Sequence, residues 1–206
     1  MVNTKEIFEY DKQFINTTTK LIAGIDEVGR GPLAGPVVCC SVIMNYENIV
    51  EGVFDSKKLT AKKREELYDK IIENAISYSI CLESEEVIDE INILEATKKC
   101  MRNCVENLDK KPDLVLVDAV KGLNLNYQTN SIIKGDQTSY AIACASILAK
   151  VYRDRLMDEY SKLYPEYEFQ SNKGYGTKKH IEALKKYGKC SIHRNSYISN
   201  FIDEAI

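Results

Sequence analysis

Three short β-forming segments of this 206-residue chain each lead into a carboxylate. These carboxylates are Asp26 and Glu27 after residues 21–25, Asp118 after residues 113–117, and Asp136 soon after residues 131–133. Carboxylates at the strand ends of an α/β sheet can converge at one edge, where such folds place their ligands. The pattern therefore predicts an α/β protein with an acidic site at one edge of its sheet.

Helical patterns alternate with these strands. The apolar, β-branched run at residues 36–44 predicts a strand that forms a hairpin with residues 21–25 through a glycine-rich turn. Thr60 is expected to cap a helix, and Asn92 with Glu95 resembles a capping box before an apolar helical stripe. Further elements are expected as a strand at residues 78–82 and as helices near residues 138–163 and 177–187.

No proline-, glycine- or serine-rich linker divides the chain, so we expect one catalytic domain over residues 1–206. Its fold class is predicted as α/β, a mixed sheet flanked by helices. The core is expected at about residues 20–165, and a small, helical, basic C-terminal region that binds substrate at about residues 166–206.

Cysteine and histidine usage limits the class of protein. The seven cysteines are odd in number, form no C-x-x-C pair and mostly lie in apolar segments, as in a reducing compartment. With only two histidines, a zinc site is not expected. No secretory signal and no apolar run of membrane-spanning length is visible, so we expect a cytoplasmic monomer that does not bind membranes.

Basic residues gather near the C-terminus although the formal net charge is −3. Residues 171–195 hold seven lysines and arginines against one acid. Such a segment is typical of a surface that follows phosphates. A solvated lysine-rich helix face is the alternative.

The four carboxylates repel one another unless a counter-charge is present. With few nitrogen or sulfur ligands available, oxygen ligands favour Mg²⁺ or Mn²⁺. Two such ions about 4 Å apart can activate water and stabilise the leaving oxygen of a phosphodiester. The alternative is that each acid is a solvated strand end, and that Asp136 only caps the following helix.

The run from Asp26 to Gly31 is the most informative motif. Adjacent acids on a strand point to opposite faces, so both serve one site only where the strand twists or bends. Gly29 and Gly31 allow close backbone approach to a ligand, and Arg30 offers a forked donor for phosphate.

The chain resembles the ribonuclease HII family, in its bacterial form, from about residue 21 to residue 201. The matching stretches, in the family's order, are IAGIDEVGRGPLAGPVV, DSKKLT, INILEATKKCMRNCVENL, DLVLVD, KGD, ASILAKVYRD, GYGTKKH and HRNSY. The resemblance implies a ribonuclease H-like fold whose metal-binding catalytic acids are Asp26, Glu27, Asp118 and Asp136.

The resemblance also assigns substrate contacts. It implies that Gly29, Arg30 and Gly31 sense the ribose 2′-OH, the group that separates RNA from DNA. Tyr175 would pack on the following deoxyribose, and Ser56 and Lys57 would lie near the substrate backbone. Simple surface exposure is the alternative for Tyr175 and for Lys57.

The implied activity is that of an endoribonuclease using manganese or magnesium ions, two per active site. It would cut RNA–DNA hybrids, and would cut duplex DNA on the 5′ side of single embedded ribonucleotides, leaving a 3′-hydroxyl and a 5′-phosphate. The rivals are a ribonuclease HIII-like enzyme, another nuclease of the same fold, and a silent hybrid-binding module. Ribonuclease HIII lacks the arginine of the Gly-Arg-Gly motif and carries an extra N-terminal domain, for which about 20 residues before the first strand leave no room.

Three positions depart from the family pattern. Ala119 follows the third acid where glycine is common, residues 137–140 lack a usual proline, and Tyr197 stands where phenylalanine is commoner. None of these departures removes a catalytic acid.

Overall fold

The computed structural model describes residues 3–202 and contains one five-stranded mixed sheet. The spatial order is β3-β2-β1-β4-β5, in which β1 pairs antiparallel with β2 and parallel with β4. β3 runs antiparallel to β2, and β5 runs parallel to β4. The strands are β1 (Ile22–Val28), β2 (Val37–Met44), β3 (Ala75–Glu83), β4 (Leu114–Asp118) and β5 (Gln128–Ile132).

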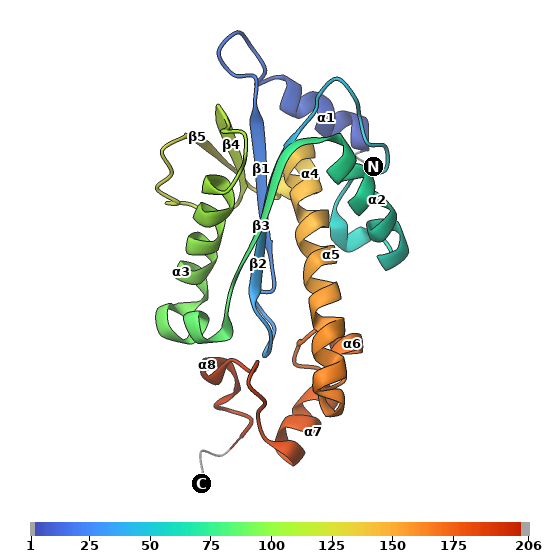
Figure 1. The fold of residues 1–206 in the computed structure, drawn as a ribbon, viewed down its shortest axis with the longest axis vertical. Coiled ribbons are helices and arrows are strands. Elements are labelled where there is room, and N and C mark those ends of the chain that lie inside the picture. Colours follow the sequence, from blue (N-terminus) through green and yellow to red (C-terminus); the bar gives the residue numbers. More distant parts are fainter. Residues whose placement is uncertain (1–2, 203–206) are drawn as a thin grey trace.

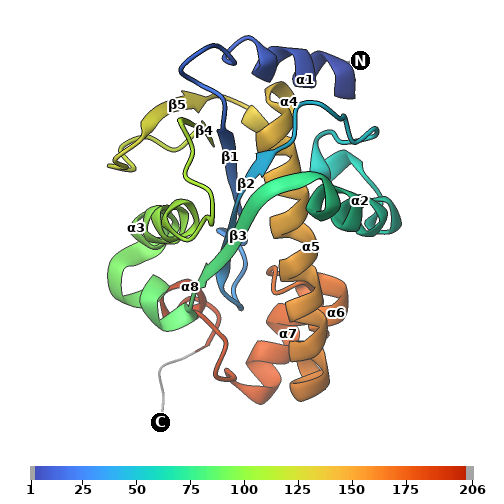
Figure 2. The same cartoon turned by 45° about the horizontal axis from the view of Figure 1, so that its top comes forward.

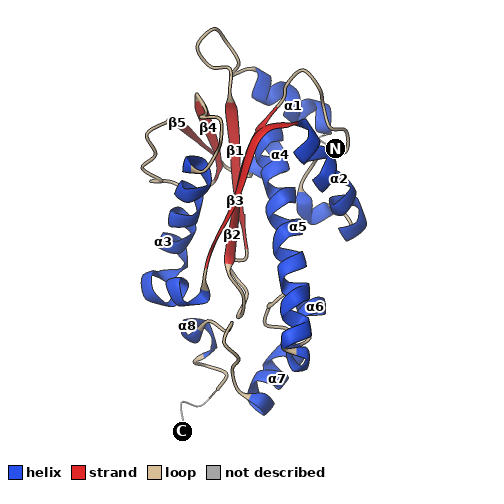
Figure 3. Ribbon diagram, viewed as in Figure 1, coloured by secondary structure: helices blue, strands red, loops and turns tan. Residues whose placement is uncertain are grey.

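Helices cover both faces of this sheet, as Figures 1 and 3 show. In the turned view of Figure 2, α3 lies on one side of the strands and α5 on the other. The helices are α1 (Thr4–Lys12), α2 (Ala61–Asn74), α3 (Glu85–Glu106), α4 (Gly135–Thr138), α5 (Tyr140–Leu163), α6 (Phe169–Asn172), α7 (Lys178–Tyr187) and α8 (Asn195–Ile198), with single 3₁₀ turns η1 (Ser56–Lys58) and η2 (Pro165–Tyr167). The predicted fold class is confirmed.

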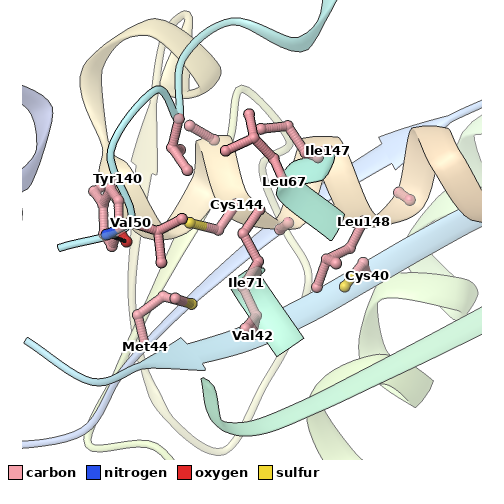
Figure 4. Packing of buried hydrophobic residues seen from close by; sticks show 14 of the residues in the cluster. Cys40, Val42, Met44, Val50, Leu67, Ile71, Tyr140, Cys144, Ile147 and Leu148 are labelled. Carbon is pink, nitrogen blue, oxygen red and sulfur yellow. Dashed lines mark hydrogen bonds between the residues drawn. The ribbon is translucent and has the colours of Figure 1, made fainter. Parts of the chain in front are cut away.

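Two apolar layers hold the sheet between its helices. On the α5 side, residues of β2, α2 and α5 interdigitate, among them Val42, Ile71 and Cys144 (Figure 4). On the α3 side, Cys100 and Cys104 pack against β1 and β4. All seven cysteines are free, and five are fully buried, so they serve as small apolar side chains, as expected.

The C-terminal helices form a separate small cluster beyond the end of β1 and the start of β2, at the bottom of Figure 1. Its buried centre includes Tyr167, Phe169 and Leu184 together with Met157 near the end of α5. Leu33 and Ala34, from the turn between β1 and β2, also belong to it. This cluster therefore ties the turn after β1 to the C-terminal part of the chain.

Several element boundaries differ from those predicted. The stripe expected from Asn92 is the second part of α3, which already begins at Glu85 and is interrupted at Asn92 (φ 67°). The Asn92 side chain accepts from the backbone N–H groups of Leu94 and Glu95, as a cap does. β3 is longer than expected, β5 lies three residues earlier at its start, and α1 was not predicted.

Asp136 does not cap the long helix. It lies inside the short helix α4, and the Ser139 side chain caps α5 by accepting from the backbone of Ile142. No helix within residues 3–202 is long and apolar enough to span a membrane.

Candidate active site

The sheet topology brings the strand-end acids to one edge. β1 and β4 are parallel neighbours with Ile25 beside Val117, so Asp26 and Asp118 follow at the same level. The backbone N–H of Gly135 donates to Asp118 Oδ1 at 2.7 Å, which places α4 and its Asp136 next to β4. We call Asp26, Glu27, Asp118 and Asp136 the acidic edge.

Asp26 and Glu27 belong to the strand itself, because β1 continues to Val28. Asp26 Oδ1 accepts from the Glu27 backbone N–H at 2.8 Å. Glu27 Oε1 lies 3.5 Å from Arg30 Nη1, whereas its Oε2 is buried without a hydrogen-bond partner. Both side chains line one cavity, although neighbours on a strand point to opposite faces.

Burial and mutual repulsion disfavour the ionised states of Asp26, Glu27 and Asp118. Burial, then the charges of Glu27 and Asp118, raise the pKa of Asp26 well above its ordinary value. Burial also raises the pKa of Glu27, with Arg30 opposing and Asp118 reinforcing the shift. The pKa of Asp118 is raised by burial and by Asp136, against the bond from Gly135. A cation at this edge would relieve the repulsion.

Lys57 supplies one positive charge beside these acids. Its Nζ lies 3.5 Å from Asp136 Oδ2. Partial burial lowers the pKa of Lys57, but the charges of Asp136 and Asp26 outweigh this, and the net shift is upward. Ser56 Oγ lies 2.9 Å from Ser146 Oγ of α5, which fixes η1 against the long helix.

A cavity of about 90 Å³ opens at the acidic edge. One water molecule takes about 30 Å³ in the liquid, so the cavity has room for a few waters or an ion, but not for a nucleotide. Its lining consists of Asp26, Glu27, Val28, Ser56, Lys57, Ser146, Lys150 and Tyr175. A nucleic acid would have to lie across its mouth.

The acidic edge fits a hard divalent cation in its chemistry. Its donors are carboxylate oxygens, and Glu27 Oε2 is a buried acceptor that lacks a donor. As the side chains stand within residues 3–202, no three acidic, imidazole or thiol groups converge on one point. Asp118 Oδ1 accepts from the Gly135 N–H, and Asp136 Oδ2 lies 3.5 Å from Lys57 Nζ, so each of these oxygens already has a partner.

The turn after β1, residues 29–36, is called the glycine loop below. Gly29 has φ +93°, and an added Cβ would lie 2.3 Å from Arg153 Nε. An added Cβ at Gly31 would instead have its nearest neighbour, Tyr175 Cε1, at an ordinary 3.8 Å. The fold therefore requires glycine at position 29 but leaves room at position 31, where the Tyr175 ring faces the loop.

Two fully buried arginines hold the glycine loop through hydrogen bonds to its backbone carbonyls. Arg153 donates to the carbonyls of Pro36 (3.0 Å), Ala34 (3.1 Å) and Lys173 (2.9 Å). Arg194 donates to the carbonyls of Gly29 (2.5 Å), Arg30 (2.9 Å) and Gly35 (2.6 Å). Burial lowers the pKa of Arg153 to about 10, so it stays charged at neutral pH.

Tyr197 completes this support. Its hydroxyl donates to the Arg30 carbonyl at 2.9 Å, and its ring lies 5.1 Å from the Arg194 guanidinium. The tyrosine that departs from the family pattern thus adds a hydrogen bond to the loop. We call Arg153, Arg194 and Tyr197 the C-terminal clamp.

The sequence did not single out Arg153 or Arg194 as loop supports. A signal for Arg153 exists, because Ser146, Lys150, Arg153 and Met157 follow one another at helical spacing. Arg194 was counted in the basic segment, and this was wrong, because it is buried. Lys173 also leaves that surface, since it pairs with Asp158, whereas Lys185, Lys186 and Lys189 are exposed.

The fold matches solved ribonuclease H-type structures. The crystal structure of ribonuclease H2 from Pyrococcus horikoshii OT3 aligns with a TM-score of 0.74 at 30% identity, covering 86% of this chain and 93% of that one. The RNase HII in a PCNA complex from Archaeoglobus fulgidus gives 0.73 at 27%, covering 90% and 98%. An RNase HIII structure at 15% identity shares the fold alone (TM-score 0.63).

The class defined by this fold and acidic edge is that of the ribonuclease H-like nucleases. The family model for ribonuclease HII matches residues 23–200. The ribonuclease HII of Caldicellulosiruptor bescii is 54% identical over 195 residues, 95% of each chain, and that of Acetivibrio thermocellus is 53% identical over 96% of this chain and 77% of its own. The chain belongs to the ribonuclease HII family, whose members are metal-dependent endoribonucleases that act on RNA–DNA hybrids.

Proposed function

We propose that this enzyme cuts the RNA strand of hybrids and also cuts duplex DNA on the 5′ side of single embedded ribonucleotides. The observation that carries the proposal is the Tyr175 ring facing Gly31 beside the cavity of Asp26 and Glu27. Tyr175, which would recognise the sugar, and the acids that would support the reaction would then lie within one nucleotide of each other.

The residues divide the work as follows. The glycine loop approaches the ribose 2′-OH through its backbone, with Arg30 toward phosphate, and Tyr175 packs on the next deoxyribose, where an added hydroxyl would crowd the ring. Ser56 and Lys57 face the backbone of the substrate. Because the sensed hydroxyl belongs to the sugar just 3′ of the scissile phosphate, the cut falls 5′ of the ribonucleotide and depends little on base sequence.

Asp26, Glu27, Asp118 and Asp136 hold the cations, two per site in this proposal, and Mg²⁺ or Mn²⁺ fits their oxygen donors. When bound, such ions supply the positive charge and Lewis acidity that phosphodiester hydrolysis needs, and the products carry a 3′-hydroxyl and a 5′-phosphate. The chain supports this by holding the carboxylates partly buried, where attraction to a cation is stronger than in water.

The C-terminal region, from about residue 166, contributes to substrate binding in this proposal. Lys185, Lys186 and Lys189 are exposed there and can follow phosphates. We further propose a monomer working in the cytoplasm, a compartment whose reducing conditions suit seven free thiols.

A mapped cleavage assay tests this function. The substrates are a duplex with one ribonucleotide, a long hybrid and an all-DNA duplex, each with Mg²⁺, with Mn²⁺ or with chelator. We expect metal-dependent cutting of the first two, the first solely at the 5′ side of the ribonucleotide. A cut on the 3′ side would refute the sensing geometry, and cleavage of all-DNA duplex would favour a different nuclease of this fold.

A further inference from the structure

The only two histidines of the chain meet in the C-terminal cluster. His180 in α7 and His193 before α8 are both buried, and their Nε2 atoms lie 3.0 Å apart. The rings of Tyr167 and Phe169 pack around them at centroid distances of 4.8 to 6.2 Å. Neither histidine has a role in the function proposed above.

The hydrogen bonds around this pair fix where each proton lies. The backbone N–H of Cys190 donates to His193 Nδ1 at 3.0 Å, so that nitrogen is an acceptor. A neutral His193 then carries its proton on Nε2 and donates to His180 Nε2. His180 is left with its proton on Nδ1, which donates to the Tyr175 carbonyl at 2.9 Å. If His180 donated to His193 instead, His193 would carry its proton on Nδ1, and this N–H would face the backbone N–H of Cys190.

The pair also connects the glycine loop with Tyr175, the two parts of the chain proposed to recognise the sugars. The backbone of His193 forms an isolated β-bridge with Ala34 of the glycine loop. Its ring contacts His180, and the His180 ring contacts the Tyr175 carbonyl. A backbone bond from Leu33 N–H to the Gly174 carbonyl (2.8 Å) joins the same two segments. His193 therefore touches the loop by its backbone, and its side chain is linked to Tyr175 only through the ring of His180.

We propose that His180 and His193 are positioning residues that hold Tyr175 against Gly31 and thereby set the selectivity for an RNA-to-DNA step. The inference rests on the proposed role of Tyr175. The Tyr175 carbonyl accepts from His180 and from the Thr177 N–H (2.8 Å), and the Tyr175 N–H donates to the Asn172 carbonyl (2.9 Å). With three backbone bonds fixed, the direction in which the exposed ring leaves the chain is fixed as well.

We call the hydrogen-bonded chain Cys190–His193–His180–Tyr175 the relay. Its order of donors and acceptors requires both histidines to be neutral, and their surroundings keep them so. The groups that face the two rings are the side chains of Tyr167 and Phe169, the Tyr175 carbonyl, and the N–H and thiol of Cys190. Burial lowers the pKa of both histidines. An additional proton would place a second donor opposite Cys190 or between the two Nε2 atoms, and the chain of bonds would break.

The first test measures the protons directly. In ¹⁵N-labelled protein near neutral pH, the ring nitrogens of two histidines give a spectrum simple enough to assign with His180→Asn. We expect a neutral His193 protonated on Nε2 and a neutral His180 protonated on Nδ1. Finding His180 protonated on Nε2, or either ring as an imidazolium, would overturn the relay whatever the activity of the enzyme.

The second test uses a matched pair of variants at His180. In His180→Asn the amide nitrogen replaces Nδ1 and can still donate to Tyr175, whereas in His180→Gln it lies near Nε2 and cannot. We expect the ratio of single-ribonucleotide to long-hybrid cleavage to fall about fivefold in His180→Gln, the size of one hydrogen bond, and to stay within about twofold in His180→Asn.

Tyr175→Ala separates this inference from the proposed function. If Tyr175→Ala lowers the ratio and folded His180→Gln leaves it unchanged, the relay does not position the ring, and the inference is wrong. If Tyr175→Ala itself leaves the ratio unchanged, the proposed role of Tyr175 fails, while the tautomer measurement still decides the relay. Should His180→Gln not fold, the tautomers remain the deciding result.

Discussion

The acidic edge gathers four carboxylates that repel one another, whereas the C-terminal clamp buries two guanidinium groups whose nitrogens all meet backbone carbonyls. At the edge, Glu27 Oε2 lacks a partner and the pKa values of three acids are raised. In the clamp, every guanidinium nitrogen of Arg153 and Arg194 has an acceptor. The difference suits the edge to binding a cation and the clamp to holding the glycine loop in place.

The largest effect on activity is expected from the edge. Asp26→Asn keeps the size of the side chain and removes a charge from the metal-binding group. Cleavage of a hybrid should fall at least about a hundredfold, since bound ions contribute several kcal/mol to such reactions. Thermal unfolding should occur at an equal or higher temperature, because repulsion decreases. An Asp26→Asn protein that cuts normally would mean that the site is misplaced.

The largest effect on stability is expected from the clamp. Arg194→Met leaves the carbonyls of Gly29 and Gly35 without donors and leaves that of Arg30 only the Tyr197 hydroxyl, which should cost about 3–5 kcal/mol. For a chain of this size, the melting temperature should fall by roughly 10 °C. Arg155→Met is the matched control, because Arg155 is half-exposed and pairs with Glu65 at the surface. It should change the free energy of unfolding by no more than about 1 kcal/mol.

Equal losses of stability in both arginine variants would contradict the clamp. They would show that carbonyls of the glycine loop find water or other donors when Arg194 is shortened, and that the loop is not held by this residue.

Alanine substitutions at Gly29 and Gly31 separate an effect on stability from an effect on activity within one motif. Gly29→Ala meets Arg153 and a positive φ, and should destabilise the protein by about 2 kcal/mol. Gly31→Ala meets only Tyr175 at ordinary distance, and should keep stability within about 0.5 kcal/mol. It should nevertheless slow single-ribonucleotide cleavage by roughly a hundredfold, because a methyl group displaces the sugar. Normal cleavage by Gly31→Ala would exclude close backbone approach there.

Lowering the pH should change the contributions of His193 and Asp26 to stability in opposite directions, with smaller effects. Burial and the neighbouring His180 lower the pKa of His193 to about 4 from 6.5, so its contribution to stability is complete above about pH 6.5 and is lost as the pH falls toward 4. Asp26 has a raised pKa in the folded state, so the fold gains stability as Asp26 takes up its proton at falling pH.

Melting curves from pH 7 to pH 4 can separate these contributions. Compared with wild type, His193→Gln should lose less stability over this range, and Asp26→Asn should lose more because its stabilising protonation is gone. Parallel curves for all three proteins would contradict both assignments.

The sequence allowed the strands and the main helical stripes to be predicted, because each leaves a local pattern. Asn92 was a correct cap, yet the helix that precedes it was missed, since a single non-helical residue joins the two parts of α3. Ala119 shows the reverse. Its φ of 47° lies in the left-handed region that favours glycine, which the composition of the strand end does not reveal.

The clamp was beyond local reasoning for a physical reason. Arg153 and Arg194 are polar residues whose burial depends on carbonyls more than 100 positions away in the chain. Helical periodicity predicts which face Arg153 lies on, but it does not predict that a buried guanidinium finds acceptors there. The same holds for the histidine pair, which only the folded C-terminal cluster brings together.

Tyr175, held at the glycine loop, is proposed to recognise an RNA-to-DNA step beside the acids. The most direct test of this claim is the ratio of single-ribonucleotide to long-hybrid cleavage rates for wild type, Tyr175→Phe and Tyr175→Ala. Packing on the sugar, rather than the phenol hydroxyl, should make Tyr175→Phe resemble wild type, while Tyr175→Ala should lower the ratio about tenfold or more, as loss of ring contact implies. Equal losses on both substrates would contradict the claim and leave Tyr175 a structural residue.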